Sequence, residues 1–486
     1  MQRFKLLKPC LILSIYYFLS VGLFAQTQDL DKPQDKPKIQ EPIPSWIGDF
    51  KKLDAKELAG KREGWYATGL PLIGNDAVSG KGGGLIANLF YNGKKDSPSF
   101  QYTPYEYSIS TGAYNSTRGT QNYFVSLDAP YFLDSPYRLK TFVGHDTNLH
   151  NQYFGLGSSS LAPLKYSDRN QPDGEMHRNA SYTDFESANS YYTSKGVGRE
   201  AVSTQRKNEY RFETTYAQFF LDKTIHKIFR LWGGAEFSKN IVRRYDGEWT
   251  KAKDPYFGVD VPVQEDISDI SRDASRGKLI GEKGGNLNYL RGGIAYDTRD
   301  YEPDPDSGWL IEYNFNRAER MIGSDFSYLR HMVQAKNFWQ PFPHYFEELV
   351  IAQRVALTRI DGNVPFFEYR YLYSIDGPMG ALGGQNTLRG YRQERFYGPV
   401  MGFYNFELRW RFASFELWDQ NFQVSLVPFY DIGQVWDRMR EISTQGYKHS
   451  RGMGMRIIWD QATVILMDMA FSKEDSLFYL DMGHTF

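Results

Sequence analysis

The feature that most constrains this chain is a strict alternation of apolar and polar side chains in its second half. Between residues 402 and 413, GFYNFELRWRFA, every second residue is apolar or aromatic and the residues between them carry three charges. A strand with this alternation has one apolar and one polar face. Segments 451–459 and 476–486 repeat the pattern.

Comparable segments recur from residue 64 to the end of the chain, and they predict sixteen strands. Their expected bounds are 64–73, 82–92, 101–112, 119–128, 137–146, 206–220, 228–240, 286–299, 308–319, 326–339, 346–359, 401–413, 422–435, 449–459, 462–472 and 476–486. Many such strands with aromatic ends and long polar loops are typical of a transmembrane β-barrel. Closure of the sheet satisfies every backbone group in lipid. The expected fold is therefore all-β, a sixteen-stranded antiparallel barrel.

Loop length predicts the orientation of this barrel. The long connections 147–205, 241–285 and 360–400 all follow odd-numbered strands, whereas 340–345 and 460–461 are short and follow even-numbered ones. With both termini in the periplasm, every long loop is extracellular, as in outer-membrane barrels.

Composition excludes several other classes of protein. Aromatic residues make up 16% of the chain, glycine occurs 44 times and the net charge is −1. Mean hydropathy is −0.55, which does not fit a bundle of transmembrane helices. The near-neutral charge gives no reason to expect a nucleic-acid partner. With one cysteine and no complete catalytic or metal-binding motif, we expect no enzyme activity, cofactor or metal.

The N-terminal region divides into two expected parts before the barrel of residues 64–486. A basic start and the apolar run Cys10–Phe24 predict a signal peptide over residues 1–25, with an uncleaved anchor helix as the alternative. Residues 26–63 are expected to form a periplasmic leader. It is proline-rich at first and then contains one short helix over 46–61, with Ser45 as its N-cap.

A group of acidic residues lies in the expected turn after the eighth strand: Asp300, Glu302, Asp304 and Asp306. Their spacing is not that of a twelve-residue calcium loop. The favoured interpretation is a turn exposed to water.

Four sequence motifs resemble one known family. LGGQNTLRGY at 382–391, followed by Phe396 and Gly398, resembles the sixth-loop signature of the BamA/TamA-type superfamily, the bacterial surface antigen family. DTRDYEPDPDSG at 297–308, NFELRW at 405–410 and VPFYDIGQVW at 427–436 agree in order.

The resemblance implies a latch in the sixth loop, folded into the barrel. Its members would be Gly383, Gly384, Arg389, Gly390 and Tyr391, and the resemblance matches Glu407 and Asp431 to the acidic partners of Arg389. Alternation independently places both carboxylates on the lumen face of their strands. Arginine suits this position because its planar guanidinium bonds carboxylates in two directions.

The implied function is insertion or translocation of polypeptides across the outer membrane. Members that do this generally carry POTRA modules before the barrel, and residues 26–63 are too few for one, so the chain resembles a barrel-only branch. Expected partners are outer-membrane lipid, the machinery that inserts the chain itself, and a polypeptide client. The alternatives are a porin-like or lipid-handling barrel and a surface antigen without a client.

Alternation also places Phe486 on the lipid side of the last strand. An aromatic residue there suits the interface girdle, and in barrels of this kind the terminal aromatic is the signal that assembly machinery reads.

The leader yields a first prediction. Deletion of residues 26–44 should leave an intact, heat-modifiable barrel, because this polar, proline-rich stretch has almost no apolar surface to bury. The migration of heated and unheated protein on a gel measures the outcome. Loss of the heat-modifiable form would show that the stretch packs inside the barrel.

Overall fold

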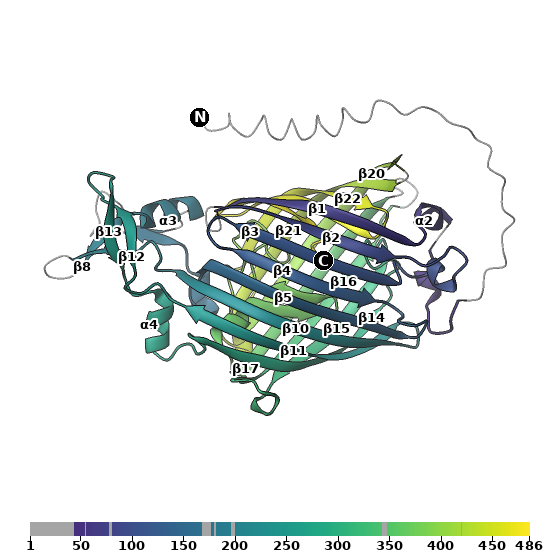
Figure 1. Cartoon of the computed structure of the whole chain (residues 1–486), viewed down its shortest axis with the longest axis horizontal. Helices are drawn as coiled ribbons and strands as arrows, with labels where there is room; N and C mark the ends of the chain where they lie inside the picture. The colour runs from purple at the N-terminus through teal and green to yellow at the C-terminus, as the bar shows by residue number, and fades with distance from the viewer. Residues whose placement is uncertain are drawn as a thin grey trace. The chain divides into compact units, whose positions relative to one another are not determined.

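The chain folds into a barrel made of one antiparallel sheet of sixteen strands (Figure 1). The computed structural model describes residues 43–53, 55–76, 80–167, 176–178, 181–195, 200–342, 348–418 and 420–486. The expected signal peptide and residues 26–42 of the leader lie outside these residues. The barrel strands are β1 (Trp65–Asp76), β2 (Gly80–Tyr91), β3 (Tyr107–Ser116), β4 (Gln121–Ala129), β5 (Tyr137–Gln152), β10 (Glu209–Ile225), β11 (Phe229–Arg243), β14 (Gly284–Asp297), β15 (Gly308–Ala318), β16 (Ser327–Trp339), β17 (Leu349–Asn363), β20 (Val400–Leu417), β21 (Gln420–Trp436), β22 (Lys448–Trp459), β23 (Thr463–Phe471) and β24 (Ser476–Met482).

Alternation determines which side of each strand faces the lumen. In β15, Ile311 and Tyr313 are exposed on the outer surface, whereas Glu312, Asn314 and Asn316 are buried inside. An apolar outer surface and a polar interior are the arrangement that a bilayer requires. The prediction of a sixteen-stranded antiparallel barrel is confirmed.

The long connections contain small elements that the sequence did not predict. They lie at the end of the barrel that we call the long-loop end, where β12, β13, β9 and β8 form a four-stranded sheet (Figure 1). These elements are η3 (Gly157–Leu161), β6 (Lys165–Ser167), β7 (Met176–Arg178), α3 (Tyr182–Asn189), β8 (Tyr192–Lys195), β9 (Glu200–Ser203), β12 (Trp249–Lys253), β13 (Asp260–Glu265), α4 (Asp269–Ser275), η4 (Arg320–Ile322) and η6 (Met439–Glu441). Within the described residues, none of the helices is long and apolar enough to cross a membrane.

The first and last barrel strands meet without a hydrogen-bonded ladder, and we call this junction the seam. β1 and β24 stand at the two ends of the strand order. The hydroxyl oxygens of Thr68 and Thr463 lie 2.8 Å apart across the seam, and the Asn88 amide donates to the Met482 sulfur at 3.2 Å. Along the described parts of both strands the sheet is therefore closed by side chains and not by backbone pairing.

The segment before the barrel lies across its opposite end, the short-turn end. It contains η1 (Asp49–Lys51) and α2 (Ala55–Gly60), so the single helix expected over 46–61 is wrong. The reason is a main-chain contact between the two pieces: the Leu53 amide donates to the Gln101 carbonyl at 2.9 Å, which keeps the chain extended there. Gln101 belongs to η2 (Pro98–Gln101), which also delays the start of the third strand from 101 to 107.

We call residues 43–53 and 55–61 the strap because they bond to turns on both sides of the seam. On the β2–β3 side, the Lys61 ammonium nitrogen donates to the Phe100 and Thr103 carbonyls at 2.7 and 2.6 Å. On the β20–β23 side, Asn421 donates to the Gly60 carbonyl at 3.1 Å and Gln461 donates to the Glu57 carbonyl at 2.7 Å. The strap thus bridges the seam at the short-turn end.

The acidic turn between β14 and β15 is not exposed to water, so that interpretation was wrong. Glu302 pairs with Arg138 at 2.5 Å and with Lys51 of the strap at 3.5 Å. Asp304 pairs with Arg411 at 2.7 Å. Burial alone would raise the pKa of the Glu302 carboxyl. The surrounding cations, of which Arg138 has the largest effect, hold that pKa well below its usual range. The turn packs inward because basic side chains of the wall and the strap balance its charge.

The strap yields a second prediction, for its dependence on pH. Burial lowers the pKa of Lys61 from its ordinary 10.5 to about 7. The released strap therefore binds the proton more tightly than the docked strap, and docking strengthens as the pH rises from 7 toward 10.5, by up to about 1.4 kcal/mol per unit. A spin label on Ser45→Cys, in a chain carrying Cys10→Ser, should become less mobile across this window.

The matched control for this measurement is Lys61→Met, which removes the titrating group and keeps an apolar chain of similar length. Its label should show the same mobility at pH 7 and pH 9. An equal pH response in both chains would assign the effect to another group.

Candidate functional site

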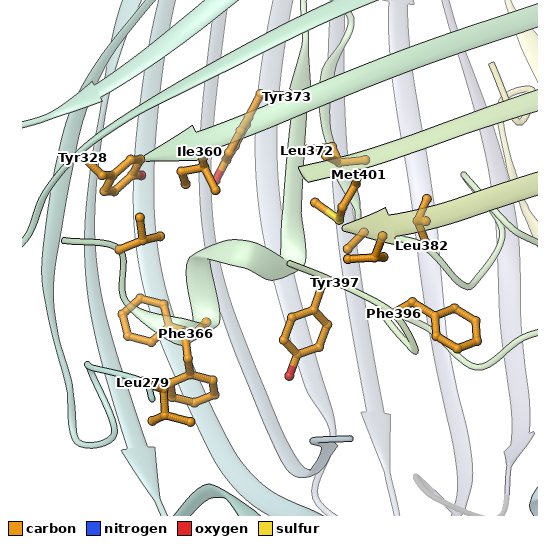
Figure 2. Close-up of a cluster of buried hydrophobic side chains, with 14 of the residues drawn as sticks. Leu279, Tyr328, Ile360, Phe366, Leu372, Tyr373, Leu382, Phe396, Tyr397 and Met401 are labelled. Atoms are coloured by element: carbon orange, nitrogen blue, oxygen red, sulfur yellow. The ribbon is translucent and has the colours of Figure 1, made fainter. Parts of the chain in front are cut away.

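The connection between β17 and β20 fills much of the lumen, and we call residues 364–399 the lumen loop. It contains η5 (Phe366–Arg370), β18 (Tyr371–Ser374) and β19 (Gly377–Gly380). Figure 2 shows Phe366, Leu372, Leu382 and Phe396 of this loop gathered in one apolar cluster, and each is fully buried. An external loop in water would leave these side chains exposed, so burial of apolar surface holds the loop inside the barrel.

Ion pairs with the wall fix the loop in position around this apolar cluster. Arg330 on β16 pairs with Glu368 at 3.0 Å and also donates to the Tyr371 carbonyl at 2.5 Å. Lys336, also on β16, pairs with Asp376 at 2.6 Å. Each pair joins a loop residue to a strand residue, so the wall determines the course of the loop.

Arg389 is the most heavily bonded residue of the loop. Its guanidinium contacts Asp431 through Nε and Nη2, both at 2.8 Å, and Nη1 contacts Glu407 at 2.7 Å and Asp468 at 2.9 Å. The guanidinium carbon lies 3.5 Å from the centre of the Phe429 ring. All three carboxylates and Arg389 have no exposed surface. This is the forked geometry that an arginine provides and a lysine does not.

Two further arginines complete a charge-balanced group, which we call the arginine cluster. Arg456 pairs with Asp468 at 2.5 Å and with Glu407 at 3.3 Å, and Arg409 pairs with Glu407 at 3.0 Å. The cluster therefore holds three arginines and three carboxylates: Arg389, Arg409, Arg456, Glu407, Asp431 and Asp468. Neutral balance matters here because an unpaired charge in a buried site is costly.

Glycines allow the loop tip to approach the wall. Gly390 has a φ of +83°, and a Cβ there would lie 3.0 Å from the Phe471 carbonyl carbon, so a larger residue would be strained at this position. The Gly390 amide donates to the Tyr479 hydroxyl at 3.0 Å, and its carbonyl accepts from Ser472 at 2.7 Å. Gly383 and Gly384 also have positive φ angles, +114° and +87°, in the turn preceding the tip.

The expected contact of Arg389 with Glu407 and Asp431 inside the barrel is present, and Tyr391 is buried against Phe396. Sequence reasoning missed Asp468 and the pairing of Arg456 with the cluster. A signal was available for Asp468, because it is the only charge in the apolar segment TVILMDMAF of β23.

Phe486 does not face lipid, so its predicted position was wrong. β24 ends at Met482, Gly483 has a φ of +97° and residues 483–486 turn into the lumen. There the Phe486 ring packs with Phe338, and its carbonyl accepts a hydrogen bond from Arg409 at 3.0 Å. The tail turns inward because the lumen supplies polar partners for its backbone, which the hydrocarbon does not.

His484 anchors the same tail to the acidic turn. Its Nε2 lies 2.7 Å from the Asp304 carboxylate. Burial, with Arg409 nearby, lowers the pKa of His484 to about 4, so the ring is neutral at pH 7 and donates to that carboxylate. The tail therefore links the acidic turn to the arginine cluster, since Thr485 also accepts from Arg389 at 3.1 Å.

The described residues contain no group of three or more His, Cys, Asp or Glu side chains arranged to hold a metal ion.

Sequence profiles of two families match the chain. The Omp85 superfamily domain matches residues 88–486, and a domain of unknown function (DUF5982) matches residues 43–106. The outer membrane protein assembly factor BamA of Nitratidesulfovibrio vulgaris is 26% identical over 207 residues, which are 39% of this chain. The matched part spans only 24% of that relative's length.

Two solved structures show a similar fold at low identity. BamA from Haemophilus ducreyi lacking POTRA domains 1–3 has a TM-score of 0.43 and 14% identity, over 87% of this chain and 70% of that one. CdiB from Escherichia coli has a TM-score of 0.46 and 9% identity, over 86% of this chain and 61% of that one. At these scores neither neighbour bears on the activity of this chain.

The arginine cluster yields a third prediction. Arg389→Ala leaves three buried carboxylates short of a partner and should lower the free energy of unfolding by about 3–5 kcal/mol. Arg389→Lys should restore only part of the loss, because an ammonium group lacks the guanidinium fork. Denaturant titration of the barrel folded in lipid vesicles measures both.

Arg359 on β17 supplies the matched control, because it forms an exposed pair with Asp361. Arg359→Ala should cost about 0–1 kcal/mol. If Arg389→Ala and Arg359→Ala lose the same stability, the cluster does not hold the loop.

Proposed function

Because the chain belongs to the Omp85 superfamily and is an integral outer-membrane barrel, we propose that it inserts or translocates polypeptides at that membrane. In this orientation the short-turn end, with the strap, faces the periplasm, and the long-loop end faces outward. A client would reach the barrel from the periplasmic side. The chain itself would be inserted by the assembly machinery that serves other outer-membrane barrels.

The observation that carries this proposal is the position of the arginine cluster beside the seam. Arg389 ties the tip of the lumen loop to β20, β21 and β23, and Thr485 joins the tail after β24 to the same guanidinium. The lumen loop and the tail that follows the last strand thus share one guanidinium group. We propose that the cluster acts as a latch, so that release of Arg389 frees the loop and loosens the seam.

The relatives support the class of activity more than its details. The match to the assembly factor BamA covers a minor part of that protein. In larger members the POTRA modules receive the client. We expect no enzymatic step, because the proposed work consists of binding and of rearranging backbone hydrogen bonds.

A fourth prediction tests the proposal in cells and in vesicles. Depletion of the protein should lower the amounts of other outer-membrane barrels. Vesicles containing the purified protein should also speed the appearance of a heat-modifiable model barrel. In the same assay Arg389→Ala should lose most of the acceleration, while Arg359→Ala keeps it.

Unchanged levels and unchanged folding of other barrels after depletion would remove the insertion and translocation proposal. If Arg389→Ala folds and remains as active as the unaltered chain, the latch role would be wrong while the general activity stood.

A solute-conducting barrel is the second candidate, favoured by a cavity of about 1060 Å³ in the lumen. Stable single-channel conductance of the purified protein in planar bilayers, together with no effect on other barrels, would support it.

A further inference from the structure

The lumen cavity lies between the lumen loop and the wall formed by the first five barrel strands. Its volume of about 1060 Å³ is at the upper end of the range for small-molecule sites. Its lining includes Leu72 of β1, Ile86 of β2 and Phe124 of β4 on the wall side, with Met379 and Asn386 of the lumen loop opposite. We call this cavity the seam chamber.

The wall side of the seam chamber carries an apolar strip between polar side chains such as Asn88, Asn122 and Asp128. Phe124 and Phe142 stack with their ring centres 5.2 Å apart, and Leu72, Ile86 and Phe90 line the same cavity. These residues point inward, whereas their sequence neighbours Val125 and Val143 are more than half exposed on the outer surface. This apolar strip is suited to a hydrocarbon chain.

The lining of the seam chamber holds two cations without an ion pair and one such carboxylate, Asp481, among the described residues. Of the basic residues in its lining, Arg138, Arg299 and Lys336 each pair with an aspartate. Lys140 and Arg354 form no ion pair with any described residue.

These two side chains bond only to neutral acceptors. Lys140 donates to the Ile375 carbonyl at 3.2 Å, and Arg354 donates to the Asn405 side-chain oxygen at 3.0 and 2.8 Å. Arg354 is 2% exposed. Lys140 is half-buried. Asp376 acts on both cations without forming an ion pair with either, so both keep the capacity to bind an anion directly.

The seam forms one boundary of the chamber. Leu72 and Asn88 line it from the β1–β2 side, and Val464, Met482 and Gly483 line it from the β23–β24 side. No backbone ladder joins β1 to β24 along their described lengths. The membrane is therefore the nearest source of a ligand that carries both a hydrocarbon chain and a charge.

We propose that the seam chamber binds one anionic phospholipid from the surrounding bilayer. An acyl chain lies against the wall of Leu72, Ile86, Phe124 and Phe142, and the phosphate of the headgroup is held between Lys140 and Arg354. Both halves of the site are needed: the rings select a hydrocarbon chain, and the two cations select an acidic headgroup over a neutral one.

Photolabelling of the full chain in a neutral maltoside detergent tests this site. The probe is a phosphatidylglycerol with a diazirine in its acyl chain, and a phosphatidylcholine with the same chain is the comparison. Mass spectrometry should find label on the inward residues Phe124 and Phe142 with phosphatidylglycerol, and unlabelled phosphatidylglycerol should compete it away. Label on the outward residues Val125 and Val143 should not saturate.

Charge variants test the headgroup contact. Lys140→Met and Arg354→Met should each raise the phosphatidylglycerol concentration needed for half-maximal label on Phe124 by about tenfold, the effect of one lost charged hydrogen bond. Lys251→Met, at an exposed lysine of the external sheet, should leave that concentration unchanged. Heat modifiability confirms that each variant is folded. If a variant does not fold, competition by unlabelled phosphatidylglycerol in the unaltered chain tests the binding of the headgroup.

Three results would overturn the proposal. Label confined to Val125 and Val143 would show that lipid reaches only the outer surface. Equal and equally competed label from phosphatidylcholine would show that no acidic headgroup is selected. Label on Phe124 from a photoreactive amphipathic peptide, with none from the lipid, would assign the chamber to a polypeptide.

Discussion

Backbone hydrogen bonding in a medium without water is the constraint on which the rest of this structure depends. A sheet in a bilayer must pair its edges, because each unpaired amide or carbonyl costs several kcal/mol there. Fifteen of the sixteen junctions between neighbouring strands meet this requirement with a ladder, and the seam does not. The short last strand, the inward tail and the contacts of Thr68 and Asn88 are consequences of that one exception.

The interior of the barrel obeys a similar constraint, which applies to charged side chains and not to backbone groups. A lumen lined by arginines and carboxylates is stable only when the charges balance locally, since the effective dielectric is lower than in water. The arginine cluster achieves this with equal numbers of both signs. The acidic turn achieves it with residues from the wall and from the strap. Lys140 and Arg354 are the exception, and they line the chamber that the seam bounds.

Much of the barrel could be predicted because alternation is a local property. Each expected strand exists, and Glu407 and Asp431 lie on the faces that alternation assigned. Arg389 was identifiable through its motif, since no local pattern distinguishes an inward-folded loop from an external one. Phe486 was placed wrongly because alternation was extended past Met482, where Gly483 ends the strand. The acidic turn was misjudged because its partners, Arg138 and Arg411, are distant in sequence. Contacts of that kind are set by barrel closure, which no local pattern records.

The strap has a mechanical consequence for the direction in which the seam can part. Lys61 holds the turn on one side of the junction, and Asn421 and Gln461 hold the turns on the other. Tension that separates β1 from β24 at this end must first break these bonds, while the far end of the seam carries no such brace from the strap. The barrel is therefore hinged at its short-turn end, and a widening seam has the shape of a wedge with its apex at the strap.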